Sequence, residues 1–161
     1  MTVLPILKDD IVHFIKPCED FDFDGTFLNP SQLARDLVDT LYSGNGLSIA
    51  ANQVGLPYRV FAFRGDPANF VCFNPHIVNT GVEEIELDES SLSFPGLVVP
   101  ITRPRNIRIR FWGPDGVQHF HDFAGLTARI CLHEIDGLNG KLFYNRASKV
   151  KRDIAFRNRG K

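Results

Sequence analysis

The sequence contains few cysteines and no long run of apolar residues. Cys18, Cys72 and Cys131 form no CxxC pair, which argues against a disulfide framework, so we expect reduced thiols that pack in the interior. No stretch approaches the roughly 18 apolar residues that a membrane span requires. The first ten residues lack the basic and then apolar pattern of a secretory signal. We therefore expect a cytoplasmic protein without a membrane partner.

The composition is that of a globular chain with an uneven distribution of charge. With 161 residues and 43% apolar content, residues 1–161 fit one compact domain. Residues 1–140 contain 10 Lys and Arg and 18 Asp and Glu. Residues 141–161 contain 8 Lys and Arg and a single acidic residue, Asp153. This basic tail at about 141–161 could bind a polyanion such as ribosomal RNA, or it could be a solvated terminus. We expect no DNA partner.

Hydrophobic periodicity predicts helices at both ends of a strand-rich middle. Leu33, Leu37, Val38 and Leu41 share one face of a helix over 32–42, which Asn29 can cap. A second helix is expected over 122–137, and a third, short helix within the basic tail. An extended start is expected over 3–7. Strands are expected at 59–63, 70–73, 77–79, 82–87, 106–112 and 117–120, in three groups around the second helix. The fold class is therefore α+β.

Three separated segments carry motif-like patterns, namely Gly46 to Gln53 (GLSIAANQ), Glu89 to Ser93 (ESSLS) and Leu132 to Gly137 (LHEIDG). In order and interval they resemble the three signature motifs of the peptide deformylase family, G-x-G-φ-A-A-x-Q, E-G-C-L-S and Q-H-E-x-D-H. The resemblance covers nearly the whole chain. It implies a peptide deformylase-like fold in which antiparallel β-sheets surround a central helix that carries the HExxG segment.

The resemblance also implies where a metal would bind. In the family, the cysteine of the second motif and both histidines of the third hold a divalent metal, usually iron and sometimes zinc or nickel. The matching positions here are Ser91, His133 and Gly137, and only His133 is retained. A serine hydroxyl is a poor substitute for a thiolate and glycine ligates nothing, so we expect no tightly bound cofactor.

The remaining catalytic groups of the family are retained. Gln53 and the backbone N–H of Leu92 match the groups that polarise the formyl oxygen, and Glu134 matches the general acid and base. The residues alone also allow simpler interpretations: Glu134 could be a salt-bridged helix residue, and the Gln53 amide could satisfy loop backbone.

The substrate pocket of the family is only partly matched. Leu47, Leu126 and Ile130 fall at apolar lining positions, whereas Ser48 replaces the second glycine of the first motif. Arg129 falls at a position that is usually apolar. Its side chain could extend to solvent, or it could bind the carboxylate or phosphate of another ligand.

The resemblance implies a protein related to the metallohydrolases that remove the formyl group from the amino-terminal formyl-methionine of nascent peptides. With the metal site incomplete, we expect impaired or absent activity. Two alternatives are an active deformylase with an unusual or weakly bound metal, and a non-catalytic module that binds nascent peptides or the ribosome. An inert fold is a third. A Ser91 and His133 hydrolase is also conceivable, but the sequence assigns no third group to orient the imidazole.

Overall fold

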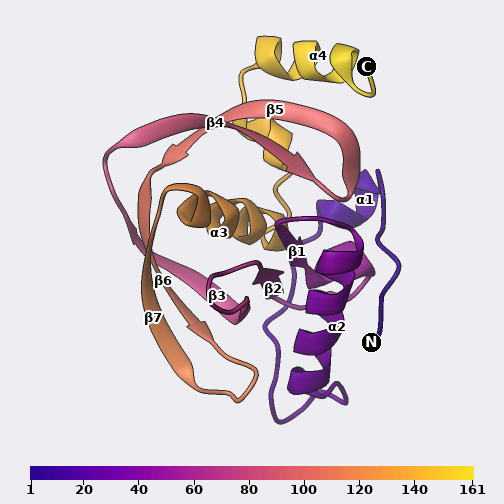
Figure 1. Ribbon diagram of the computed structural model, residues 1–161, viewed down its shortest axis with the longest axis vertical. Coiled ribbons are helices and arrows are strands. Elements are labelled where there is room, and N and C mark those ends of the chain that lie inside the picture. Colours follow the sequence, from indigo (N-terminus) through magenta and orange to yellow (C-terminus); the bar gives the residue numbers. More distant parts are fainter.

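The computed structural model describes residues 1–161, and its strands form two antiparallel sheets (Figure 1). The larger sheet has the order β1-β2-β3-β6-β7, and β4 and β5 form a separate two-stranded sheet. The strands are β1 Ser48–Ala50, β2 Val60–Phe63, β3 Phe70–Thr80, β4 Glu84–Ser91, β5 Phe94–Pro104, β6 Asn106–Trp112 and β7 Gln118–Ala124. The α+β class is confirmed, but the expected three groups of strands are two sheets.

The structure contains four α-helices, of which α1 was not expected and the other three lie at or near the expected segments. They are α1 Ile11–Phe14, α2 Pro30–Ser43, α3 Gly125–Leu138 and α4 Lys149–Asn158, with short 3-10 helices η1 Ala51–Val54 and η2 Phe143–Arg146. The Asn29 side chain caps α2 by accepting a hydrogen bond from the backbone N–H of Gln32 at 3.0 Å. No helix is both long enough and apolar enough to cross a membrane.

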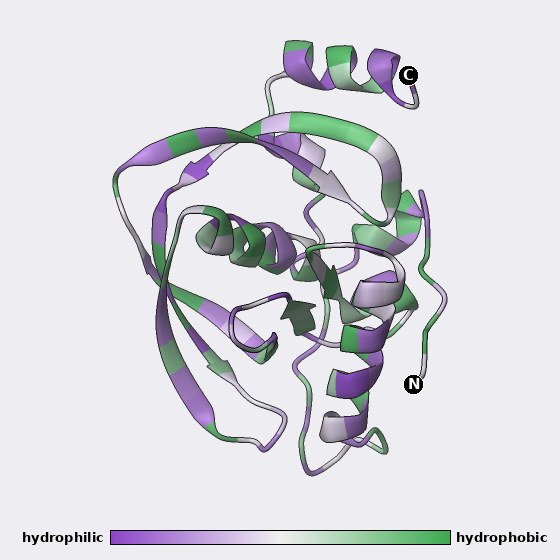
Figure 2. Ribbon diagram, in the orientation of Figure 1, coloured by the Kyte–Doolittle hydropathy of each residue, from purple (hydrophilic) through white to green (hydrophobic).

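The central helix α3 lies between the two sheets, so that its apolar residues are buried over most of its length (Figures 1 and 2). It begins at Gly125, three residues later than the expected 122. The reason is that residues 122–124 continue β7, where Asp122 pairs with Arg108 and Ala124 with Asn106. Hydrogen bonding to a neighbouring strand therefore overrides the helical pattern of these residues.

Three apolar clusters hold the elements together. The first joins α3 to the inner face of the larger sheet, and includes Phe61, Ile109 and Leu138. The second joins α2 to β1 and β2, and the third joins β5 to α1, η2 and α4. The first cluster contains six residues of α3, so it fixes this helix against the larger sheet.

Some segments differ from the sequence-based expectation. The strand β5 was not expected, since Pro95, Pro100 and Pro104 break the usual strand pattern. Residues 70–73 and 77–79 belong to one long, irregular strand, β3. Residues 3–7 form no strand, because their backbone groups bond elsewhere: the N–H of Leu4 to Thr40 Oγ1 at 2.8 Å and the N–H of Leu7 to the Gln53 carbonyl at 2.7 Å.

The basic tail is docked rather than extended. Its helix α4 packs against β5, and Ser148 caps it. Lys151 forms an ion pair with Glu86, and Arg159 with Asp9 at 2.7 Å. Four of the eight cations of residues 141–161 make ion pairs within the chain, namely Arg146, Lys149, Lys151 and Arg159. The other four are Lys141, Arg152, Arg157 and Lys161.

Candidate active site

One cleft gathers the three motif segments. It consists of a small cavity of about 40 Å³ and a larger cavity of about 610 Å³, and both are lined by Ser91, His133 and Glu134. The η1 turn contributes Gln53, the β4–β5 hairpin contributes residues 91–93, and α3 contributes His133 and Glu134. Segments that are about 40 residues apart in the sequence thus meet at a single site.

The structure brings the residues singled out from the sequence together. Gln53 and Gly137 line the smaller cavity and Leu92 lines the larger one. The five expected substrate-pocket residues, Leu47, Ser48, Leu126, Arg129 and Ile130, all line the larger cavity. Of these, Leu47 and Leu126 are exposed at its edge, and Ile130 is buried. Cys131 is buried in the core behind α3 and lines neither cavity, as its position on the helix predicts.

The residues at the three metal-ligand positions do not fit a tightly held divalent ion. No group of three or more His, Cys, Asp or Glu side chains lies together in a suitable arrangement. At Gly137, a Cβ atom added to the backbone would have no neighbour within 4 Å, so the position has space for a side chain but supplies no ligand. The Ser91 hydroxyl instead belongs to a hydrogen-bond network of protein groups. The donor set is therefore one imidazole, far short of the three protein ligands of a catalytic site.

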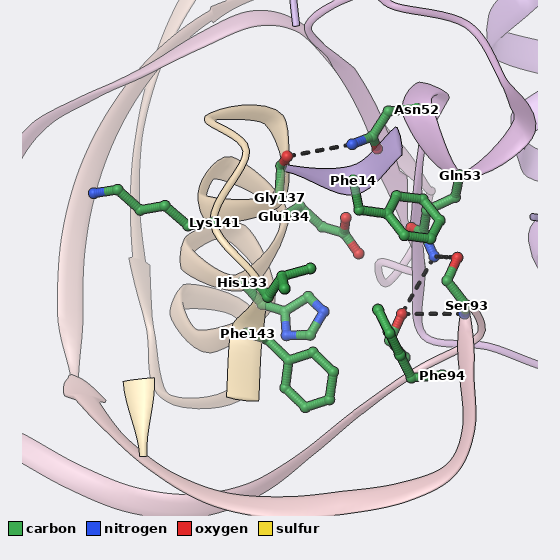
Figure 3. A pocket seen from close by; sticks show the side chains of 12 residues that line it. Phe14, Asn52, Gln53, Ser93, Phe94, His133, Glu134, Gly137, Lys141 and Phe143 are labelled. Carbon is green, nitrogen blue, oxygen red and sulfur yellow. Dashed lines mark hydrogen bonds between the residues drawn. The ribbon is translucent and has the colours of Figure 1, made fainter. Parts of the chain in front are cut away.

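Gln53 connects the backbone of its own loop to the β4–β5 hairpin, and the two lie on the same side of the smaller cavity, facing His133 and Glu134 (Figure 3). Its Oε1 accepts a hydrogen bond from the N–H of Ala50 at 2.9 Å, so the amide does satisfy loop backbone. Its Nε2 donates to Ser93 Oγ at 3.0 Å and to Ser91 Oγ at 3.4 Å. The amide is therefore fixed, and its donor side faces the cleft where a carbonyl oxygen could be bound.

Glu134 is a buried carboxyl group with one close hydrogen bond. It is 4% exposed, and Ser48 Oγ donates to its Oε1 at 2.5 Å. No ion pair involves Glu134, so it is not the salt-bridged helix residue that the sequence allowed. Burial raises its pKa, and this effect is partly opposed by its interactions with His133 and Ser48. The Ser48 side chain, which stands where the family's first motif has its second glycine, thus contacts Glu134 directly. Glu134 is the residue that matches the family's general base.

His133 is oriented by a carboxylate that the sequence-based reasoning did not assign to the site. Its Nδ1 lies 2.8 Å from Glu89 Oε1, and Glu89 is 5% exposed. Arg103 binds the same carboxylate through two hydrogen bonds of 2.6 and 3.0 Å. Burial alone would raise the pKa of Glu89, but the hydrogen bonds from His133 and Arg103 lower it to about 2. Glu89 is therefore an ionised hydrogen-bond acceptor at neutral pH.

Arg129 points inward, which differs from both expectations for its side chain. It is 4% exposed, and its Nη1 donates to Glu89 Oε2 at 2.7 Å and to the Ile101 carbonyl at 2.6 Å. Its Nη2 donates to the Ile85 carbonyl at 2.7 Å. The guanidinium therefore neither extends to solvent nor offers most of its donors to a ligand. It forms a wall of the larger cavity and ties α3 to β4 and β5.

A second carboxylate extends this network away from the cleft. Asp136 accepts hydrogen bonds from Arg103 Nη1 at 2.7 Å and from Arg146 Nε and Nη2 at 2.8 and 2.7 Å. Glu89 opens the second motif, so its place in the motif could have indicated a role. Nothing in the sequence marks Arg103 or Arg146, because each meets its partner only through the packing of β5 and η2 against α3.

The chain was compared with known proteins. The family model described as polypeptide deformylase matches residues 3–153. The peptide deformylase of Brucella suis is 34% identical, over 98% of this chain and 91% of that protein. The crystal structure of a peptide deformylase from Legionella pneumophila superposes with a TM-score of 0.88 at 29% identity, covering 98% of this chain and 93% of that one. The enzyme from Thermus thermophilus also superposes with a TM-score of 0.88, at 29% identity, over 96% and 92% of the two chains.

Proposed function

Because the chain belongs to the peptide deformylase family, we propose that its cleft binds the formylated amino terminus of a nascent peptide in the cytoplasm, and that metal-dependent deformylation is impaired or absent. The observation that carries this proposal is a contrast within one site. Gln53, Leu92 and Glu134 line the cleft, whereas two of the three ligand positions around it are Ser91 and Gly137.

The proposed roles follow from the chemistry of the groups. The Gln53 amide and the backbone N–H of Leu92 donate to the formyl oxygen, and the larger cavity accepts the methionine side chain between Leu126, Ile130 and Leu47. Glu134 accepts a proton in the family's reaction, but here no metal-bound water is available for it to activate. We therefore expect the cleft to bind the formylated peptide without hydrolysing it.

Binding is tested with the full chain in the presence of a chelator. We expect a formyl-methionyl peptide to bind more tightly than the same peptide without the formyl group, by about fivefold for one hydrogen bond of about 1 kcal/mol. Gln53→Glu keeps the acceptor for the N–H of Ala50 but removes the side-chain donor, so it should weaken this preference even though the backbone N–H of Leu92 remains. Gln32→Glu, on the exposed face of α2, is the matched control. Equal binding of both peptides to the unsubstituted protein would refute peptide recognition by the cleft.

Turnover is tested on protein purified without chelators. We expect well under one equivalent of iron, nickel or zinc, and little deformylation. Stoichiometric metal bound through His133, with activity that follows the added metal, would instead establish an active deformylase with an unusual site. Binding without turnover would identify a non-catalytic module, and the loss of both would identify an inert fold.

The basic tail is proposed as the contact with the ribosome. The cations of residues 141–161 that make no ion pair are Lys141, Arg152, Arg157 and Lys161, and they remain available to phosphates. Co-sedimentation with ribosomes should weaken as salt increases. It should also weaken in Arg157→Glu with Lys161→Glu, but not in Arg35→Glu on α2. Equal co-sedimentation of the two variants would exclude the tail.

A further inference from the structure

One face of the larger sheet carries arginine and aromatic side chains and is covered by no helix. The helix α3 packs against the inner face of β6, through residues that include Ile107 and Ile109. Because side chains alternate along a strand, Arg108, Arg110 and Trp112 project from the opposite, outer face. Figure 1 shows no helix on the side of β6 and β7 that faces away from α3. The outer face is therefore open to a partner.

The register of the strands places two aromatic rings beside two guanidinium groups on this outer face. Phe120 of β7 lies opposite Arg110 and is 49% exposed. The Cζ atom of Arg108 lies 5.5 Å from the centre of the Phe120 ring, and that of Arg110 lies 5.3 Å from the centre of the Trp112 ring. Since Trp112 pairs with Gln118, the two aromatic residues are diagonal neighbours, roughly 7–8 Å apart.

The outer face has a surplus of positive charge, although residues 1–140 as a whole are acidic. Arg110 forms no ion pair, and its buried Nε has no hydrogen-bond partner. Asp122, the only acidic residue of β7, is bound by Arg108 through Nη1 alone, so the other donors of Arg108 remain free. Burial and the charge of the nearby Arg110 lower the pKa of His76, which lies opposite it on β3. An anionic partner would complement this charge.

The combination of rings and cations fits a single-stranded nucleic acid. Phosphates accept hydrogen bonds from guanidinium groups, and unstacked bases stack on aromatic rings and on guanidinium planes. An acidic peptide would use the arginines but leave the rings uncovered, and a double helix would keep its bases away from a flat sheet. Asn79 lies opposite Arg108, and Gln118 opposite Trp112. Both amides are exposed and without a partner in the chain, so they can bind the 2′-hydroxyl groups of RNA.

We propose that the outer face of β3, β6 and β7 binds a single-stranded segment of RNA. Two bases stack on Phe120 and Trp112, and Arg108 and Arg110 bind the phosphates between and beside them. None of these four residues lines either cavity of the cleft, so this binding requires neither the peptide recognition proposed above nor the basic tail.

The test uses the full chain and an oligouridylate of about eight nucleotides. Trp112 is the only tryptophan of the chain, so its fluorescence reports binding at this face. We expect the oligonucleotide to quench this fluorescence. The logarithm of the association constant should fall with the logarithm of the salt concentration with a slope of about −1.4, for two phosphates neutralised by Arg108 and Arg110.

Substitutions separate the two kinds of contact, with the anisotropy of a labelled oligouridylate as the readout. Arg110→Glu should weaken binding by at least about tenfold and reduce the slope to about −0.7, since one phosphate contact is lost and a repulsive charge is added. Phe120→Ala should weaken binding by at least about fivefold and leave the slope unchanged, because stacking is not ionic. The matched controls are Arg35→Glu on α2 and Phe27→Ala in the fully exposed loop before it, and both should bind like the unsubstituted protein.

The variant Arg157→Glu with Lys161→Glu should also keep its affinity for the oligouridylate, which distinguishes this face from the basic tail. Unchanged fluorescence of Trp112 would overturn the proposal, as would a loss of binding in the tail variant but not in Arg110→Glu. Equal affinity for duplex RNA, for an oligodeoxyuridylate of the same length or for polyglutamate would overturn the assignment of single-stranded RNA as the partner.

Discussion

Two carboxylate sites flank His133, and they differ sharply in how well they are satisfied. Glu89 is bound by Arg103, Arg129 and His133, in a network that continues to Asp136. Glu134 is equally buried, but it has a single close hydrogen bond, from Ser48. The first arrangement lowers the pKa of its carboxyl group, and the second raises it. The partners of Glu89 therefore hold its carboxylate in one position, whereas burial of the Glu134 carboxylate lowers the stability of the fold.

The difference separates the hydrogen-bond network that supports His133 from the metal-ligand positions beside it. Glu89, Arg103 and Asp136 form a continuous hydrogen-bond network, and Arg129 adds a guanidinium at a position that the family usually fills with an apolar residue. The positions that match the family's cysteine and second histidine are Ser91 and Gly137, which offer no thiolate and no imidazole. We expect this network to hold the backbone at positions 91 and 137 in a geometry that metal ligands could use, and this can be tested directly.

The largest effect is expected from restoring the ligands. Ser91→Cys with Gly137→His should bind one equivalent of zinc, because His133 is already oriented and the space at position 137 is open. When free zinc exceeds its Kd by about 1,000-fold, the free energy of unfolding should rise by about 4 kcal/mol. Metal analysis and thermal unfolding with and without zinc measure both quantities.

Each single substitution is the control for this prediction. Two protein ligands make a weaker site than three, so either change alone should bind zinc far less tightly. If the double variant binds no metal, the supporting network does not hold the cleft in the expected geometry. If it binds metal but does not deformylate, the substrate pocket is altered as well, and Arg129 is the first residue to test.

An effect of similar size, and of opposite sign, is expected from breaking the network. Arg103→Ala should lower the free energy of unfolding by about 3–5 kcal/mol, since it leaves Glu89 and Asp136 buried without their shared partner. Arg105→Ala is the matched control, because its pair with Glu83 is exposed and should contribute less than about 1 kcal/mol. Urea denaturation of both variants at neutral pH measures the difference. Equal losses would show that burial of the network contributes nothing.

Much of the fold and of the cleft was predictable, whereas the network was not. The helix around Leu37, the strand over 106–112 and the meeting of the three motifs follow from local patterns, and the structure confirms each of them. The strand β5 was hidden by its prolines. The inward course of Arg129 depends on the Ile85 and Ile101 carbonyls, which approach it only through the packing of β4 and β5. Long-range partners of this kind leave no periodic signal in a sequence.

The network should also make stability depend on acidity. The pKa of Glu89 lies at about 2 in the folded chain, below its ordinary value of 4.5. The ionised Glu89 therefore makes its full contribution to the free energy of unfolding above pH 4.5. This contribution, roughly 3 kcal/mol in all, is lost as the pH falls from 4.5 towards 2. The pKa of Asp136 is also lowered, and it adds a loss of the same sign. Denaturation between pH 6 and pH 2.5 should show a shallower decline for Glu89→Gln than for the unsubstituted protein.

The smallest effect is expected at Glu134, where the dependence on pH has the opposite sign to that of Glu89. Because burial raises its pKa, the ionised carboxylate destabilises the fold above its ordinary range, and this penalty disappears once the pH falls low enough to protonate it in both states. Glu134→Gln keeps an acceptor for the Ser48 hydroxyl and removes the charge, so it should stabilise the protein at pH 7 by on the order of 1 kcal/mol. The gain should vanish near pH 4.

Glu84→Gln, on an exposed strand position, should change stability by less than about 0.5 kcal/mol at either pH. If Glu134→Gln is instead less stable than the unsubstituted protein at pH 7, the Glu134 carboxylate is a structural group, and the contrast with Glu89 fails.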